Sequence, residues 1–308
     1  MKYLVTGGAG FIGSHIAEEL VREGHDVTIV DDLSTGKLSN IFPFEDKVNL
    51  VQGDIRDYDL MRKVTQGIDI VFHEAAIASV AKSVEDPVAT DAINVGGTVS
   101  VLTAAKECGV KKVVFASSAA IYGDDPELPK REDMAPKPLS PYAFHKLAGE
   151  YYLRLFHRLY GLQGVALRYF NVFGPRQDPK SEYSGVISIF LDRFKRDVEY
   201  TIYGDGKQSR DFVYVKDVVR ANLAAAATDF DHVPVINVAC CRSNDLLTLA
   251  QHLQDISGVS RQAQFGPERA GDIKHSRADN TRLKTLLKVD PKVGFREGLE
   301  KLWQAEIA

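Results

Sequence analysis

Cysteine is scarce in this sequence of 308 residues, which contains only three. Because the count is odd and small for so long a chain, a disulfide framework is disfavoured and a reducing cytoplasm fits. Cys240 and Cys241 are adjacent, but no C-x-x-C or similar ligand spacing accompanies them. We therefore expect core thiols at these two positions and no metal site.

Neither sign of charge predominates: Lys and Arg total 38, Asp and Glu total 42, and the formal net charge is −4. A chain with this charge balance lacks the net positive charge that favours binding to nucleic acid or to an anionic membrane. No apolar run approaches the roughly 18 to 20 residues that would span a bilayer. The apolar start breaks into glycines rather than a small-residue cleavage site. We expect a cytoplasmic protein with no nucleic-acid or membrane partner.

Short β-branched runs alternate with helical periodicity in the first half of the chain. Strands are predicted at 2–6, 27–30, 48–51, 69–72, 112–117 and 165–168, and helices at 11–23, 56–65, 94–108 and 141–160. Hydrophobic residues are 44% and charged residues 26% of the chain, which indicates a globular protein. The alternation predicts an α/β fold, a doubly wound parallel Rossmann-type sheet with helices on both faces.

Two segments interrupt this alternation. Residues 124–140 are charged, rich in proline and long for a strand-to-helix connection, which is typical of a functional loop. Residues 174–184 end the doubly wound region; beyond them we expect strands near 200–203 and 211–215 and helices near 216–228, 245–257 and 295–305. The sequence thus predicts a Rossmann-type domain over 1–172 and, mainly over 173–308, a smaller α/β substrate lobe. Residues 235–239 are a possible strand returning to the main sheet.

The segment TGGAGFIG at residues 6–13 follows the first predicted strand and opens the first helix. Gly7 and Gly10 permit a tight turn close to a pyrophosphate, and Gly13 lets the helix pack closely on the strand. The start of the helix, at Phe11 and Ile12, supplies amide donors and the positive end of its dipole to the phosphates. This context predicts a dinucleotide site.

Asp31 and Asp32 end the second predicted strand. A carboxylate there accepts hydrogen bonds from the adenine ribose and repels a 2′-phosphate. Since no arginine is adjacent, the pattern favours NAD over NADP. The predicted cofactor site extends over the next residues, Ser34, Thr35 and Gly36.

The spacing G-x-x-G-x-x-G, the segments GDIRD (53–57) and HEAAIASV (73–80), Asn94 and Tyr-x-x-x-Lys at 142–146 together resemble the extended short-chain dehydrogenase/reductase family. The resemblance covers nearly the whole chain. It implies that Asp54 and Ile55 flank the adenine and that Ala75 and Ala76 line the path toward the nicotinamide, with Asn94 also in the cofactor site. We give Glu74 no catalytic role and interpret it as a polar residue at a strand end.

Ser140 and Pro141 are typical of a helix N-cap and first turn. Tyr142 and Lys146 then lie on one face of that helix. An adjacent ammonium and a charged nicotinamide both stabilise a tyrosine phenolate, so the pair predicts a catalytic base with its tuning cation, and Lys146 can also hold the cofactor ribose. His145 lies off this face, where we expect a solvated residue.

Ser117 and Ser118 end a predicted strand at the edge where open α/β sheets bind ligands. The resemblance implies that Ser118 bonds the reacting sugar hydroxyl and that Ser117 lies nearer the nicotinamide. Dehydratases of the family carry an acid pair at the next two positions and nucleotide-glucuronate decarboxylases carry a Glu at the second, where this chain has Ala119 and Ala120. These reactions are therefore disfavoured, and 4-epimerisation of a nucleotide sugar remains.

The second lobe carries residues suited to a diphosphate sugar. Asn171 follows a strand end, and Arg210 and Arg269 from distant segments suit a bidentate grip on a pyrophosphate. Resemblance to UDP-hexose 4-epimerases implies both arginines on the phosphates and Asp272 on the uridine ribose. It also places Thr201, Ile202 and Tyr203 beside the uracil and adds Val186 to the substrate site.

Ser276 stands where UDP-hexose 4-epimerases have the residue that borders the C2 substituent of the sugar. A small residue there predicts acceptance of UDP-GlcNAc and UDP-GalNAc, with UDP-Glc and UDP-Gal also open. The alternatives are a UDP-glucuronate 4-epimerase or another sugar-nucleotide oxidoreductase of the family. A non-enzymatic NAD-binding regulator is disfavoured because it would lack Tyr-x-x-x-Lys. The family likeness also implies a homodimer through helices 94–108 and 141–160.

Overall fold

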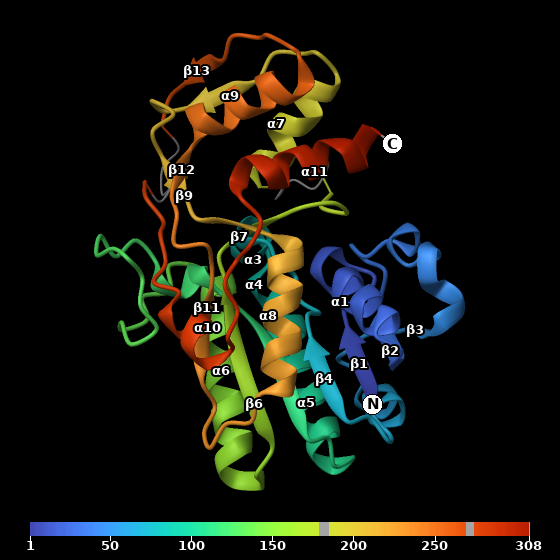
Figure 1. Cartoon of the computed structure of the whole chain (residues 1–308). Helices are drawn as coiled ribbons and strands as arrows, with labels where there is room; N and C mark the ends of the chain where they lie inside the picture. Colours follow the sequence, from blue (N-terminus) through green and yellow to red (C-terminus); the bar gives the residue numbers. More distant parts are fainter. Residues whose placement is uncertain (179–184, 269–273, 308) are drawn as a thin grey trace.

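The protein, described by a computed structural model over residues 1–178, 185–268 and 274–307, is built on a seven-stranded sheet. The strand order is β11-β6-β5-β4-β1-β2-β3, and every neighbouring pair is parallel. These strands are β1 (Lys2–Thr6), β2 (Asp26–Asp31), β3 (Val48–Gln52), β4 (Ile70–His73), β5 (Lys112–Ser118), β6 (Gln163–Tyr169) and β11 (Val235–Val238). The predicted doubly wound Rossmann-type α/β fold is confirmed (Figure 1).

Helices cover both faces of the sheet. One face carries α1 (Phe11–Arg22) and α8 (Val215–Ala227), which lie side by side (Figure 1). The other carries α2 (Tyr58–Val64), α5 (Gly97–Glu107) and α6 (Pro141–Tyr160). Successive strand residues face opposite sides, so each strand must be apolar throughout to serve both layers.

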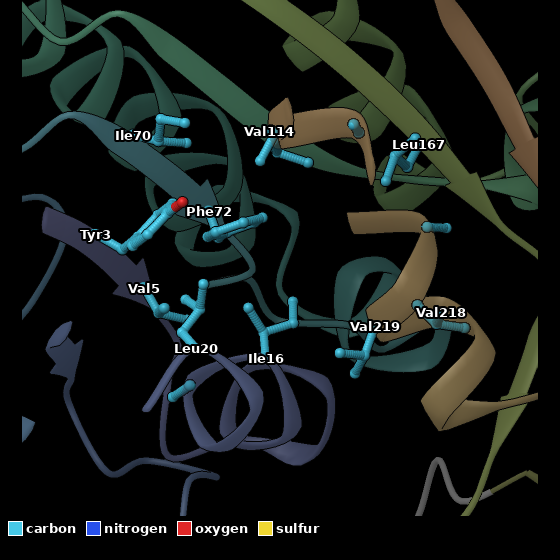
Figure 2. Packing of buried hydrophobic residues seen from close by; sticks show 14 of the residues in the cluster. Tyr3, Val5, Ile16, Leu20, Ile70, Phe72, Val114, Leu167, Val218 and Val219 are labelled. Carbon is cyan, nitrogen blue, oxygen red and sulfur yellow. The ribbon is translucent and has the colours of Figure 1, made fainter. Parts of the chain in front are cut away.

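Figure 2 shows the layer between α1, α8 and the sheet. Ile16 of α1 and Val218 of α8 pack with Phe72 and Leu167, and all four side chains are buried. The neighbouring strand residue Val71 belongs to the cluster on the other face. The continuous apolar strands in the sequence therefore follow from burial on both faces.

Helix α6 begins and ends where the sequence predicts. The Ser140 hydroxyl accepts a hydrogen bond from the Ala143 amide at 3.2 Å, and Pro141 occupies the first turn. Gly161 ends the helix with φ +74, a left-handed conformation that glycine adopts without strain. These caps fix the start of the helix that carries Tyr142 and Lys146.

A second helix is longer than predicted. Before α5 come α3 (Val80–Glu85), α4 (Pro87–Asp91) and a π-helical turn (Ala92–Gly96), so residues 87–107 are continuously helical. Contrary to the sequence expectation, Pro87–Glu107 is long and apolar enough to meet the length and composition of a membrane span. Within the fold this helix packs against α2 and α6, and 44% of its apolar window is buried. Such burial is typical of a core helix.

The second lobe lies above the carboxyl edge of the main sheet (Figure 1). It holds α7 (Val186–Lys195), α9 (Leu246–Ser257) and α11 (Phe295–Ile307) around an aromatic core that includes Phe190, Phe194 and Tyr200. Its strands form three short pairs: β7 (Asn171–Phe173) with β10 (Phe212–Tyr214), β8 (Thr201–Tyr203) with β13 (Gln264–Gly266), and β9 (Ser209–Arg210) with β12 (Asn244–Asp245). Short 3-10 helices cover Leu38–Asn40, Phe42–Lys47 and Ala119–Tyr122, and α10 (Thr281–Leu286) lies beside β11.

The two cysteines that follow β11 are not both in the core. Cys240 is half-buried, and Cys241 is exposed with φ +59. The expectation of core thiols is wrong for Cys241 because β11 ends at Val238 and the chain then turns outward. Burial raises the pKa of the Cys240 thiol to about 12.

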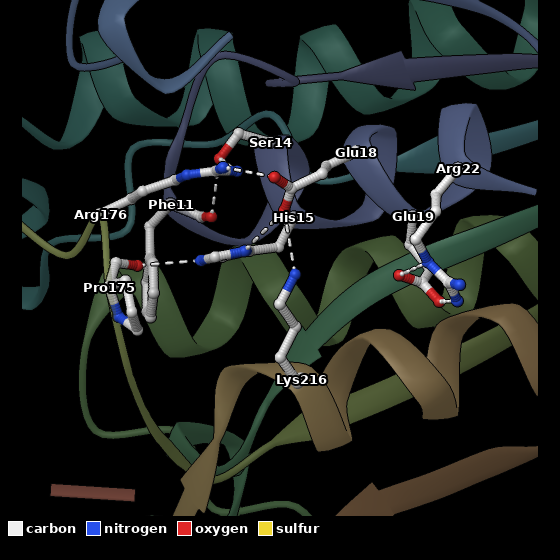
Figure 3. Close-up of polar contacts among 9 residues, drawn as sticks. All are labelled: Phe11, Ser14, His15, Glu18, Glu19, Arg22, Pro175, Arg176 and Lys216. Atoms are coloured by element: carbon white, nitrogen blue, oxygen red, sulfur yellow. Dashed lines mark hydrogen bonds and ion pairs between the residues drawn. The ribbon is translucent and has the colours of Figure 1, made fainter. Parts of the chain in front are cut away.

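A polar cluster joins α1 to the second half of the chain (Figure 3). The Glu18 carboxylate accepts from Arg176 Nη2 and from Lys216 Nζ, each at 2.9 Å. The His15 ring lies 2.9 Å from the Pro175 carbonyl oxygen through Nε2. The His15 ring and these two cations hold the pKa of Glu18 well below its usual range. Glu18 is therefore an anion that anchors the glycine-rich helix to the segment leading into the second lobe.

Candidate active site

The glycine turn after β1 leaves no room for side chains. Gly7 has φ +67, and a Cβ there would lie 2.7 Å from the Ala75 backbone nitrogen. A Cβ on Gly13 would lie 2.3 Å from the Gly7 carbonyl oxygen, and one on Gly10 would lie 3.1 Å from the same atom. Phe11 and Ile12 open α1 directly after this turn. The backbone therefore forms a cradle at a helix N-terminus, which fits a pyrophosphate.

Asp31 ends β2 beside this cradle. Its carboxylate accepts from the backbone amides of Ala9 and Leu33, each at 2.9 Å, and burial raises its pKa. A Cβ on Gly36 would lie 2.6 Å from Asp31 Oδ1. This carboxylate is at the position where a ribose hydroxyl would be bound.

The residues around Asp31 order the same loop. Asp32 Oδ1 accepts from the Ser34 amide at 2.9 Å and from the Ser34 hydroxyl at 2.6 Å, and Thr35 follows. Lys37 forms an ion pair with Asp178 at 2.8 Å. An ion pair thus joins the loop that follows β2 to the segment that precedes α7.

Three residues that the sequence places in the cofactor site use their side chains for contacts within the protein. Asp54 pairs with Arg56 at 2.6 Å, and this bond lowers the pKa of Asp54. Ile55 is buried in the core, where a Cβ on Gly97 would touch it at 2.5 Å. The Asn94 amide accepts from the Ile77 amide at 2.8 Å and donates to the Ile77 carbonyl at 3.1 Å. Asn94 thereby fixes the loop after Ala75 and Ala76, which are half-buried at the end of β4.

Tyr142 and Lys146 lie on the same side of α6, over the carboxyl end of β5. Lys146 Nζ donates to the Ala116 carbonyl at 2.9 Å and lies 6.0 Å from the centre of the Tyr142 ring. The Tyr142 backbone amide donates to Ser83 Oγ at 3.0 Å, so α3 satisfies a free donor of the first turn. Burial raises the pKa of Tyr142, while the Ser118 hydroxyl lowers it. Burial lowers the pKa of Lys146 to about 8.

The two serines at the end of β5 face different partners. Ser118 Oγ accepts from the Ala120 amide at 3.1 Å and caps the 3-10 turn. Ser117 Oγ donates to Glu150 Oε1 at 2.6 Å, and Glu150 forms two hydrogen bonds with Arg168, at 2.8 and 2.9 Å. This buried network has no signature in the sequence, because its members come from three separate elements. The Ser118 hydroxyl therefore acts on Tyr142, whereas the Ser117 hydroxyl is bound to Glu150 of α6.

His145 is buried, and the expectation of a solvated residue is wrong. Its Nδ1 lies 3.4 Å from Asn94 Nδ2 and its Nε2 lies 3.5 Å from Asp91. The residue faces the π-helical turn before α5, a neighbour that is remote in sequence. Another histidine, His73, is held between Thr6 and Thr98 at 2.8 and 2.9 Å, and burial lowers its pKa to about 3.

A cavity of about 330 Å³ opens in the second lobe. Asn171, Val186, Thr201, Tyr203 and Arg210 all line it, so the structure brings together five residues that the sequence places in the substrate site. Ile202 is buried in the core between Thr201 and Tyr203. Its alternation with the lining residues follows from the strand geometry of β8.

Ser276 lies near this cavity through its backbone. Its amide donates to the Ser209 carbonyl at 3.0 Å, directly before Arg210. Two other predicted substrate residues, Arg269 and Asp272, lie outside the described residues. Among residues 1–178, 185–268 and 274–307, no group of three or more His, Cys, Asp or Glu side chains could hold a metal ion.

The fit of Gly7 against Ala75 generates a test of the cofactor site. We expect Gly7→Ala to weaken NAD binding at least tenfold, because the added Cβ displaces the turn that carries the phosphate cradle. Gly24→Ala is the matched control: its φ is also positive at +80, but a Cβ there meets no atom within 4 Å. Calorimetric titration with NAD measures both variants. Equal losses in both would indicate backbone strain rather than close approach.

Comparison with known proteins agrees with this geometry. Residues 3–239 match the NAD dependent epimerase/dehydratase family. A UDP-glucose 4-epimerase from Thermotoga maritima, solved with UDP-glucose, is 40% identical, with a TM-score of 0.95 over 100% of this chain and 99% of that one. A UDP-N-acetylglucosamine 4-epimerase from Methanobrevibacter ruminantium, solved with UDP-N-acetylmuramic acid, is 41% identical, with a TM-score of 0.95 over 99% and 98%.

A UDP-glucuronic acid 4-epimerase from Bacillus cereus, solved with UDP-glucuronic acid and NAD, is 34% identical, with a TM-score of 0.91 over 99% of this chain and 98% of that one. These neighbours share one reaction type and differ in the sugar. The glycine cradle, the Tyr142–Lys146 pair and these similarities lead to one assignment. The chain belongs to the NAD-dependent epimerase/dehydratase family, among its UDP-sugar 4-epimerases, which are isomerases.

Proposed function

We propose that the protein interconverts the C4 epimers of a UDP-hexose, with Tyr142 as the base for the C4 hydroxyl and Ser118 as its hydrogen-bonding partner. Bound NAD supplies an acceptor for the C4 hydride and then the donor that returns it to the other face. The position of Tyr142 and Lys146 at the carboxyl edge of β5, beside Ser118, carries this proposal. Gly7, Gly10, Gly13 and Asp31 would hold the cofactor.

Charge explains how Tyr142 becomes a base. Its phenol is buried, which raises its pKa and disfavours the phenolate. The Lys146 ammonium and the positive nicotinamide ring of oxidised NAD oppose this effect, because both stabilise a negative oxygen. The phenolate of Tyr142 would thereby be favoured beside Lys146, and it would accept the proton of the C4 hydroxyl.

The substrate half of the site is assigned to the cavity of the second lobe. Arg210 would contact the diphosphate, Asn171 would donate to it, and Thr201 and Tyr203 would flank the uracil. The half-exposed Tyr203 ring offers a flat surface for a base. Arg269 and Asp272 complete the proposed site from outside the described residues.

The acid–base inventory favours epimerisation over elimination. Ala119 and Ala120 lie beside Ser118 in the 3-10 turn and carry no acid that could protonate a leaving hydroxyl. A UDP-glucuronate 4-epimerase is the second candidate because the Bacillus cereus neighbour uses the same fold. Consumption of added NAD in proportion to sugar would instead indicate a net dehydrogenase. The scarcity of cysteine favours a cytoplasmic location.

The size of Ser276 supports an N-acetylated hexose as substrate. An acetamido group at C2 needs space that an aromatic side chain would fill, and overpacking costs about 1–3 kcal/mol. Ser276 lies in the segment that runs beside Ser209 and Arg210, so a sugar attached to a diphosphate on Arg210 is within reach of it. We therefore propose UDP-GlcNAc and UDP-GalNAc as the preferred pair.

An apolar surface on α6 supports a homodimer. Phe144, Tyr151, Leu155 and Leu159 are exposed on this helix, with Leu159 at 63%. Val88 of the neighbouring helical segment is 80% exposed. An apolar surface of this kind is typical of a protein interface, and a second copy supplies the same helices for a four-helix contact.

Replacing Tyr142 with Phe removes the proposed base. We expect Tyr142→Phe to lower kcat by at least about 10²-fold, with NAD still bound, because general-base catalysis typically contributes about 10²–10⁴-fold. Tyr160→Phe, at the exposed end of the same helix, is the control and keeps turnover. Interconversion is measured by NMR without added cofactor. Unchanged turnover in Tyr142→Phe would remove this residue from the mechanism.

Replacing Ser276 with Tyr tests the choice of sugar. We expect Ser276→Tyr to lose roughly ten- to hundredfold of its activity on UDP-GlcNAc and UDP-GalNAc, because overpacking of about 1–3 kcal/mol corresponds to that range. Activity on UDP-Glc and UDP-Gal should persist. Ser276→Ala is the size control and keeps both activities. Turnover of UDP-GlcNAc by Ser276→Tyr at the parental rate would exclude Ser276 as the gate.

Charging the exposed face of α6 tests the homodimer. We expect the parent to be dimeric and the double variant Leu155→Glu, Leu159→Glu to be monomeric at micromolar concentration, because paired copies would bury four like charges. Leu286→Glu, at an exposed leucine of α10, is the control. Light scattering coupled to size-exclusion chromatography gives the masses. A monomeric parent would refute the dimer.

A further inference from the structure

Glu74 lies between the glycine cradle of the cofactor site and the Tyr142–Lys146 pair. It directly follows β4, and its amide donates to the Thr6 carbonyl at 3.2 Å. A Cβ on Gly7 would lie 3.1 Å from the Glu74 carbonyl carbon, so the backbone of Glu74 borders the phosphate cradle. On its other side, the Glu74 side chain acts electrostatically on Lys146. By its position in the sequence, Glu74 is only a polar residue at a strand end.

The hydrogen bonds of Glu74 do not balance if it is ionised. Tyr169 Oη lies 2.8 Å from Glu74 Oε1 and 3.0 Å from Asn222 Oδ1. Asn222 Nδ2 donates to the Val218 carbonyl at 2.9 Å, which fixes its oxygen toward Tyr169. A tyrosine hydroxyl has one proton, so it can donate to only one of these two oxygens.

The remaining contact of the Tyr169 hydroxyl is a hydrogen bond only if the partner group carries a proton that it can donate to Tyr169. Of the two partners of Tyr169, only Glu74 can supply one, as a neutral carboxylic acid. The sequence of donors is then complete: Glu74 donates to Tyr169, and Tyr169 donates to Asn222. When Glu74 is ionised, Tyr169 turns its proton toward the carboxylate and the buried Asn222 oxygen loses its donor.

The charged groups around Glu74 permit both forms near neutral pH. Tyr169 faces it from β6, Lys146 and Tyr142 act on it from α6, and α8 contributes the neutral amide of Asn222. Burial raises the pKa of Glu74 to about 7, while the Tyr169 hydroxyl and the Lys146 ammonium oppose that rise. An ionised Glu74 in turn raises the pKa of Tyr142 and of Lys146.

We propose that Glu74 is a positioning residue that holds a proton beside the catalytic pair, and that this proton sets the strength of Tyr142 as a base. With neutral Glu74, the Lys146 ammonium is the uncompensated charge next to Tyr142 and favours its phenolate. With ionised Glu74, a carboxylate offsets that ammonium and the phenolate is disfavoured. The proton of Glu74 exchanges with solvent and is not passed to the sugar. This inference rests on the proposed role of Tyr142.

Two substitutions separate the charge of Glu74 from its hydrogen bonds. Glu74→Gln has the shape of the neutral acid, and its amide can donate to Tyr169, so the donor sequence stays complete without a titrating group. Removal of the anion lowers the pKa of both Tyr142 and Lys146. Tyr169→Phe keeps the carboxyl group but removes the hydroxyl that joins it to Asn222, so Glu74 still titrates, with a changed pKa.

The first experiment detects the proton directly. NMR of isotope-labelled glutamate carboxyl carbons is recorded against pH on the enzyme as purified. We expect one signal that titrates near neutral pH, is missing in Glu74→Gln and keeps titrating with a different midpoint in Tyr169→Phe. Burial also raises the pKa of Glu132, so the Glu74 signal is assigned by its loss in Glu74→Gln. Glu45→Gln, at an exposed residue, should leave it unchanged.

The second experiment measures kcat/KM against pH. Tyr142 must be deprotonated and Lys146 protonated, so any limb of the profile that lies above the pKa of Glu74 moves to lower pH in Glu74→Gln, where the anion is absent. A profile that superimposes on the parental one, or the absence of a near-neutral glutamate signal removed by Glu74→Gln, would overturn the proposal. If Tyr142→Phe keeps turnover while Glu74 still titrates, the proposed base fails and the proton site stands.

Discussion

The buried ion pair between Glu150 and Arg168 is the contact on which the geometry of the active site depends. Glu150 lies one and two turns beyond Lys146 and Tyr142 on α6, at intervals of four residues. Its carboxylate joins α6 to Arg168 of β6 and to Ser117 of β5, and Arg168 lies 4.8 Å from the centre of the Tyr122 ring. Removal of one partner from such a pair typically costs about 3–5 kcal/mol, because a buried charge is left without a partner. The helix can therefore hardly rotate or slide over the sheet.

A second set of charged contacts fixes the cofactor helix relative to the rest. Glu18 of α1 holds Arg176 and Lys216, which come from the segment after β7 and from α8 (Figure 3). The Lys37–Asp178 pair joins the ribose loop to nearly the same segment. Gln177, which stands between Arg176 and Asp178 in the chain, lines the same cavity as Arg210. Ion pairs thus join the segment after β7, which contributes to the cavity, to the helix and the loop of the cofactor region.

How much of this could be predicted from the sequence depended on whether the signal was local. The glycine turn, the strands of the main sheet and the bounds of α6 were predictable, because glycine spacing, apolar runs and Ser140–Pro141 act over a few residues. Helix α7 was missed because its sequence, VISIFLDRFK, is rich in β-branched and aromatic residues. In the second lobe, β8 and β10 were predicted, near 200–203 and 211–215, whereas β7, β9, β12 and β13 were not, because two or three residues are too few to show a period.

The side-chain environments in the site were not predictable, because they depend on partners far apart in the chain. His145 is buried by contacts with Asn94 and Asp91, and a helical pattern alone places it in solvent. The Glu74 contact with Tyr169 spans 95 positions, and both residues look ordinary in sequence. Charge pairing across elements is set by the completed fold, so the group that tunes a site can be its least conspicuous residue.

The place of β11 in the sheet has a consequence for biosynthesis. This strand pairs with β6, yet the chain builds β7 to β10, α7 and α8 before reaching it. As the polypeptide leaves the ribosome, β6 is an open edge whose amides and carbonyls are free to pair with other chains. The nucleotide half is therefore not a unit that matures on its own: nascent chains stay vulnerable to aggregation until residue 238 has emerged, after much of the upper lobe has been synthesised.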